Sequence, residues 1–267
     1  MGLFSRNYDK PGPGVNKDEP RKKGAARFFE LLLRDFWDLT KLNLLFCICV
    51  LPTAVLFVLG TLGAVEYYSG LALMISLMLA FPVGGALTAC VYYITKMMRD
   101  DPSYVWYEFK RKFKENYKQA ALPGILCTAF VYAQILLWTN ILLGEPTSGV
   151  SVWLVVAILS LLVFGIITPY IFLSFAYIEQ RTLIILKNSV LMSFGFLPRS
   201  IIGALLGGII WIAFMLFLPI SLLFLPLVIL FFVSISMLLN LMWVWKPFDE
   251  HFKIEETLIE RQNEEEN

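Results

Sequence analysis

Residues 200–245 read SIIGALLGGIIWIAFMLFLPISLLFLPLVILFFVSISMLLNLMWVW and contain no Asp, Glu, Lys, Arg or His. A helix needs about 20 apolar residues to cross a bilayer core about 30 Å thick. This block of 46 residues is therefore long enough for two transmembrane helices. Its apolar residues come in runs and do not alternate with polar ones, which is unlike the strands of a membrane barrel. Helices also satisfy their own backbone N–H and C=O groups, as a lipid environment requires.

Two blocks nearer the N-terminus have the same character. Glu66 is the only charged residue in residues 42–94, and Glu145 is the only one in residues 119–178. Each block again has room for two helices, with the acid near the turn. Either Pro219 or Pro226 marks the turn of the last block, and the sequence leaves this choice open. We expect six spans, paired in three hairpins, near residues 42–63, 71–95, 121–143, 151–178, 201–218 and 222–245.

The composition indicates the same class of protein. Of the 267 residues, 58% are hydrophobic and 16% are charged, and the mean hydropathy is +0.70. Soluble domains have roughly 45–50% apolar and about 25% charged residues, so a soluble enzyme is excluded as the default. We expect an all-α polytopic membrane helix bundle over residues 24–245. A disordered cytoplasmic segment, residues 1–23, precedes it, and a charged cytoplasmic tail, residues 246–267, follows it.

The distribution of basic residues predicts the orientation of the chain. The segment up to Lys41 has 9 Lys and Arg, residues 96–118 have 7, residues 179–199 have 3, and the tail from Lys246 has 3. These account for all 22 in the chain, so the opposite connections have none. Because Lys and Arg are retained on the cytoplasmic side, both termini are expected to be cytoplasmic.

Three segments next to the hairpins are predicted to be interfacial helices. In residues 24–41, apolar residues recur at helical spacing, with basic residues on the far side. Residues 103–118 repeat this pattern, and residues 182–199 are a third candidate. The candidate face on the second segment consists of Trp106, Phe109, Lys110, Phe113, Lys114, Tyr117 and Lys118.

This face has two plausible partners, anionic membrane lipid and another protein. Trp and Tyr favour the headgroup level, and each nearby Lys or Arg adds about 1 kcal/mol of attraction to anionic lipid. A protein-docking role is the alternative. Nucleic-acid binding is disfavoured, because spans on both sides hold the segment at the bilayer.

The sequence offers no catalytic, metal or cofactor site. The interiors of the spans have no ionisable residue, which disfavours a proton- or ion-coupled transporter. His251 is interpreted as a surface residue, and the four cysteines as small packing residues. The amides Asn43, Gln134, Asn140 and Asn240 are interpreted as helix-packing groups rather than substrate ligands. Kinks or breaks are expected at Pro52, Pro82 and Pro169.

Several short motifs carry a family resemblance. They are the stretch 34–43 read on through Pro52; Phe81-Pro82-Val83-Gly84 with Thr88, Tyr92-Tyr93 and Lys96; and Phe109 followed by residues 113–119. Over about residues 11–120 the chain resembles the YesL-like family of bacterial integral membrane proteins, which is catalogued as a domain of unknown function. Gly12-Pro13-Gly14-Val15 with Lys22-Lys23 is similar to a subgroup with an N-terminal extension.

The resemblance implies a setting but no site residue. Family members are expected to be small polytopic proteins of the bacterial cell membrane, encoded beside importers and sensor kinases for plant-type oligosaccharides. We therefore expect a non-enzymatic accessory or regulatory partner of a carbohydrate uptake system, with importer permease or sensor kinase subunits as partners. The alternative is a self-sufficient small-molecule transporter or channel, which six helices with Pro-broken spans would also fit.

Overall fold

The computed structural model describes residues 22–61, 69–101, 103–143, 150–216 and 228–266. Within these ranges the chain forms 11 α-helices and one π-helical segment, and it has no strand. The all-α fold expected from the sequence is therefore confirmed. Most of the predicted N-terminal segment 1–23 lies outside the described residues. The predicted tail is helical, since α12 continues to Phe252 and α13 covers Ile254–Glu266.

Four helices are long and apolar enough to cross a membrane. They are α2 (Phe36–Thr61), α6 (Ala121–Leu143), α7 (Val150–Tyr177) and α12 (Val233–Phe252), the last continuing from the π-helical segment η2 (Val228–Phe232). Two bent pairs also qualify when each is counted as one span. These are α3 (Ser69–Met78) with α4 (Phe81–Met98), bent by 45°, and α8 (Thr182–Gly195) with α9 (Leu197–Leu216), bent by 97°. The described chain thus has four to six candidate spans.

Two of the expected spans differ in detail from the observed helices. The span expected at 71–95 is interrupted, because Pro82 occupies the first turn of α4 and cannot continue α3. By contrast, Pro52 and Pro169 lie inside continuous helices. Of the expected kink or break, the break is therefore absent at these two prolines. The span expected from residue 201 begins at Leu197, where α9 turns away from α8.

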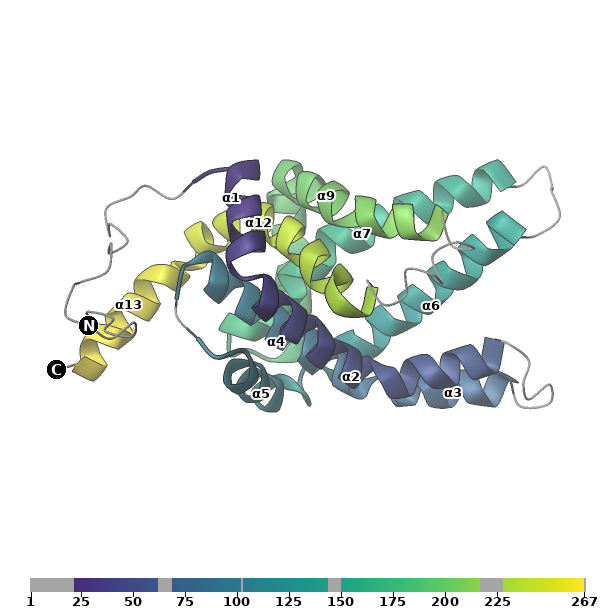
Figure 1. Cartoon of the computed structure of the whole chain (residues 1–267), viewed down its shortest axis with the longest axis horizontal. Helices are drawn as coiled ribbons and strands as arrows, with labels where there is room; N and C mark the ends of the chain where they lie inside the picture. The colour runs from purple at the N-terminus through teal and green to yellow at the C-terminus, as the bar shows by residue number, and fades with distance from the viewer. Residues whose placement is uncertain (1–21, 62–68, 102, 144–149, 217–227, 267) are drawn as a thin grey trace, which may run out of the picture.

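A separate helix precedes each hairpin, at all three places expected from the sequence. These helices are α1 (Ala25–Arg34), α5 (Val105–Asn116) and α8. The first is shorter than the predicted 24–41, because the backbone leaves the helical region at Asp35 and α2 begins at Phe36. Figure 1 shows α1 and α5 on opposite sides of the bundle, near the end from which α13 projects.

The main core surrounds α4, which is buried along most of its length. Its neighbours in contact include α2, α5, α6, α7 and α12. Gly84 on α4 and Gly124 on α6 lie so close that a Cβ on Gly84 would be 1.8 Å from the carbonyl oxygen of Ala120. Small residues of this kind let helix backbones approach closely in membranes. A second, small cluster of Trp138 and Ala157 lies apart from this core.

Candidate docking surface and polar pocket

A buried ion pair fixes α5 to the end of α4. Glu108 is 6% exposed, and its carboxylate accepts a hydrogen bond of 2.7 Å from Lys96 Nζ and one of 2.5 Å from Arg111 Nη2. Arg111 Nη2 also donates to the hydroxyl of Tyr92 on α4 at 3.0 Å. Since Lys96 and Tyr92 belong to α4, these contacts hold α5 in one orientation.

Burial alone would raise the pKa of Glu108, but the hydrogen bonds from Lys96 and Arg111 outweigh it. The pKa of Glu108 is consequently lower than its ordinary value of 4.5. The carboxylate therefore stays ionised at neutral pH, and the ion pair persists.

The predicted basic aromatic face divides into an inner and an outer part. Phe109, Phe113 and Tyr117 face inward, with successive ring centroids 6.1 Å apart, and Phe113 and Tyr117 pack on Gly85 of α4. Trp106 is 63% exposed. The outer part also includes the exposed Lys110, Lys114 and Lys118.

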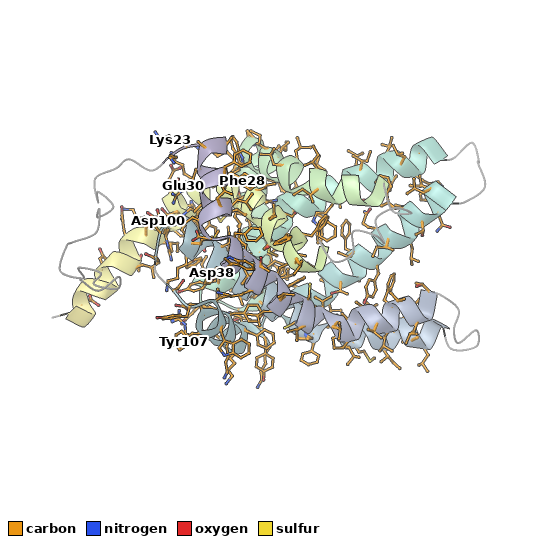
Figure 2. The ribbon with its side chains drawn as sticks, viewed as in Figure 1. Lys23, Phe28, Glu30, Asp38, Asp100 and Tyr107 are labelled. Carbon is orange, nitrogen blue, oxygen red and sulfur yellow. The ribbon has the colours of Figure 1, made fainter. Side chains whose placement is uncertain are left out.

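Two exposed tyrosines enlarge this outer part beyond the predicted residues. Tyr104 is 85% exposed and Tyr107 is 63% exposed. Figure 2 shows Tyr107 at the outer edge of the molecule, on the side opposite Glu30. Their closeness to Trp106 in the sequence could have identified them as part of this face. We call the set Tyr104, Trp106, Tyr107, Lys110, Lys114 and Lys118 the α5 outer face.

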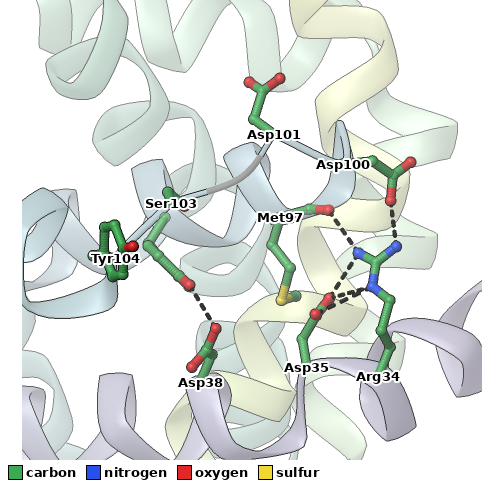
Figure 3. A pocket seen from close by; sticks show the side chains of 9 residues that line it. Arg34, Asp35, Asp38, Met97, Asp100, Asp101, Ser103 and Tyr104 are labelled. Carbon is green, nitrogen blue, oxygen red and sulfur yellow. Dashed lines mark hydrogen bonds and ion pairs between the residues drawn. The ribbon is translucent and has the colours of Figure 1, made fainter. Parts of the chain in front are cut away.

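A polar pocket of about 480 Å³ lies between the α1–α2 corner and the end of α4. Figure 3 shows Arg34 at one side of the pocket, with its guanidinium bonded to Asp35, Asp100 and the carbonyl oxygen of Met97. The sequence gives no signal for this pocket, because its residues come from segments about 60 positions apart. It is lined by Arg34, Asp35, Asp38, Tyr93, Met97, Asp100, Asp101, Ser103 and Tyr104.

Ion pairs in and beside this pocket attach α1 to the end of α4. Arg27 donates to Asp100 at 2.7 Å and to the carbonyl oxygen of Met98 at 3.1 Å, and Arg34 donates to Asp100 at 2.5 Å. Two cations thus lie at the C-terminus of α4, where the helix dipole favours positive charge. Burial raises the pKa of Asp100, but the bonds from Arg34 and Arg27 lower it further, to below its ordinary value. Arg34 and Asp100 of the pocket thus hold α1 against the end of α4.

The described residues contain no group of three His, Cys, Asp or Glu placed to hold a metal ion. His251, the only histidine, is exposed and its ring packs edge-on against Phe196 and Phe252. Cys47, Cys49, Cys90 and Cys127 form no disulfide bond among the described residues.

The fold defines the class of this protein as a helical integral membrane protein. A family model described as "Protein of unknown function, DUF624" matches residues 39–138, which run from α2 into α6 and include α5. This match agrees with the resemblance to the YesL-like family drawn from the same part of the sequence. No curated protein and no solved structure matches the chain.

Proposed function

We propose that this chain is a non-enzymatic accessory or regulatory subunit of an oligosaccharide uptake system in the bacterial plasma membrane. The family resemblance supplies the association with sugar importers and sensor kinases. The single structural observation that supports a partner-binding role is the α5 outer face. It presents aromatic rings and three lysines outward, while the buried Glu108–Lys96 pair keeps its helix in place.

The α5 outer face suits both lipid and protein. Its aromatic rings fit the headgroup level of the bilayer, and its lysines fit anionic lipid or an acidic surface on a partner. Aromatic residues are also enriched at protein–protein interfaces. We propose that lipid covers part of the face and that an importer permease or sensor kinase subunit covers the lysines.

Reversal of the lysine charges is expected to disrupt the partner complex. The test is the triple variant Lys110→Glu, Lys114→Glu and Lys118→Glu, purified from the native membrane in mild detergent beside wild type. Importer or sensor subunits should be recovered with wild type and be reduced at least tenfold with the variant. A matched control reverses Lys246 and Lys253, two exposed lysines at the end of α12. Equal recovery with the triple variant would refute docking through this face.

The proposed orientation places both termini in the cytoplasm. It is supported by the clustering of all Lys and Arg in four segments on one side of the predicted spans. A reporter enzyme that works only in the cytoplasm is expected to be active when fused after Asn267 and inactive when inserted at Glu145. The reverse pattern would overturn the topology.

A self-sufficient transporter is the second candidate. The observation that favours it is the presence of two bent helix pairs, with angles of 45° and 97°. Interrupted helices form substrate sites in several transporter folds. Uptake of a labelled oligosaccharide into vesicles that contain this protein alone would favour this candidate over the accessory role.

A further inference from the structure

Two buried polar atoms on α6 have no hydrogen-bond partner among the residues that the structure describes. One is Oε1 of Gln134, a residue that is 5% exposed, and the other is Nε1 of Trp138, which is 1% exposed. The amide nitrogen of Gln134 is satisfied, since it donates to Ser160 Oγ on α7 at 2.7 Å. Because positions four apart lie on one face of a helix, the residues with the open acceptor and the open donor share one face of α6.

The indole of a second tryptophan nearby is paired. Trp211 on α9 packs against the cluster that contains Trp138, and its Nε1 donates to Ser236 Oγ at 3.1 Å. Ser236 in turn donates to the carbonyl oxygen of Gly207 at 2.8 Å. Leaving a buried donor or acceptor unpaired is costly, and the cost is greater in lipid, where water offers no alternative. The unpaired atoms of Gln134 and Trp138 therefore require an explanation.

We propose that Gln134 and Trp138 form a binding site for a small neutral molecule that carries hydroxyl groups. A hydroxyl group both donates and accepts, so it can pair with Gln134 Oε1 and with Trp138 Nε1. The ligand is neutral because α6 and α7 contain no Asp, Glu, Lys, Arg or His to compensate a charge. The indole rings of Trp138 and Trp211 supply flat apolar surface for its C–H groups.

The packing around these residues is consistent with ligand entry. Among the described residues, Trp138 belongs to a small cluster with Ala157, separate from the extended core around α4. Regions with few buried apolar contacts open at lower free energy than the main core. Trp138 also lies in the part of α6 nearest the connection to α7, so the site is near one end of the bundle.

The test is titration calorimetry on the full-length protein in lipid nanodiscs, with glycerol, inositol, glucose and cellobiose as probes. Wild type is expected to bind at least one probe saturably. Gln134→Leu and Trp138→Phe should each weaken that binding at least tenfold. Melting temperatures show whether each variant folds, since Gln134→Leu also loses the hydrogen bond to Ser160 and Trp138→Phe makes a buried side chain smaller. Folding and binding are thereby separated.

Two matched variants serve as controls. Asn140→Leu alters an amide on the same helix whose Nδ2 bonds within that helix, to Leu136. Trp153→Phe alters a tryptophan on α7 that is 55% exposed. Both should bind within twofold of wild type. If water alone pairs with the two atoms, no probe will bind to wild type, and that result overturns the proposal, as does equal binding by Gln134→Leu and Trp138→Phe.

This site goes beyond the docking role of α5 and can fail separately from it. The triple lysine variant is expected to bind the probe as wild type does, because Lys110, Lys114 and Lys118 lie on α5 and in the turn after it, not on α6. Loss of partner recovery with retained probe binding would support both proposals.

Discussion

Replacement of Glu108 by Gln is expected to destabilise the protein by about 3 kcal/mol, since removing one member of a buried ion pair leaves the other charge uncompensated. Lys96 would lose its partner while its side chain is only 17% exposed. Loss of the pair with Arg111 adds less to this destabilisation, because the Arg111 side chain is 40% exposed and solvent screens its charge. The measurement is the free energy of unfolding in detergent micelles at pH 7, with circular dichroism as the readout.

The same residue predicts the pH dependence of stability. Because the pKa of Glu108 is lower in the folded protein than its ordinary 4.5, its contribution is complete above that pH. It is lost as the pH falls through the lower folded value. The difference in stability between wild type and Glu108→Gln should therefore shrink below about pH 4.5.

The matched control is Glu115→Gln on the same helix. Glu115 pairs with Lys112 at 2.8 Å but is 46% exposed, so its loss should cost less than about 1 kcal/mol. Equal effects of the two variants would show that the Glu108–Lys96 pair does not attach α5 to α4.

Replacement of Gly84 by Ala is expected to destabilise the protein by about 3 kcal/mol or more, through overpacking. The added Cβ would lie 1.8 Å from the backbone carbonyl oxygen of Ala120, and a backbone atom cannot move aside cheaply. Either α4 and α6 separate or the chain fails to fold. The measurements are yield after membrane extraction and the unfolding midpoint.

Gly208→Ala is the control for this variant. A Cβ on Gly208 would meet no atom within 4 Å, and the residue lies in α9. Ala has a higher helix propensity than Gly by roughly 1 kcal/mol, so this change should be neutral or stabilising. If Gly84→Ala were as stable as Gly208→Ala, α4 and α6 could not approach each other as closely as described.

The sequence predicted the helical class and the hairpins because long blocks with at most one charged residue are typical of paired membrane-spanning helices. It did not separate Pro82, which interrupts a span, from Pro52 and Pro169, which do not. Proline has no backbone N–H to donate to the helix. Inside a helix, neighbouring groups decide whether the helix continues past it. This information lies in tertiary contacts.

The candidate site was predicted in part for a similar reason. Helical periodicity grouped Trp106 with Phe109, but it could not show that Phe109 faces α4 while Trp106 faces outward. Both residues are apolar, and in a membrane protein either protein or lipid can cover an apolar side chain. The polar pocket could not be predicted, because residues far apart in the sequence, such as Arg34 and Asp100, come together only in the folded chain. The unpaired atoms of Gln134 and Trp138 likewise appear only once their neighbours are known.

The central claim, that this protein works by binding a membrane partner, is tested most directly by purification from its native membrane in mild detergent. Mass spectrometry would then identify and quantify the recovered proteins. We expect stoichiometric recovery of importer permease or sensor kinase subunits with wild type, and their loss with the triple lysine variant. Recovery of the protein alone, stable and homogeneous, would contradict the account and favour a self-sufficient transporter.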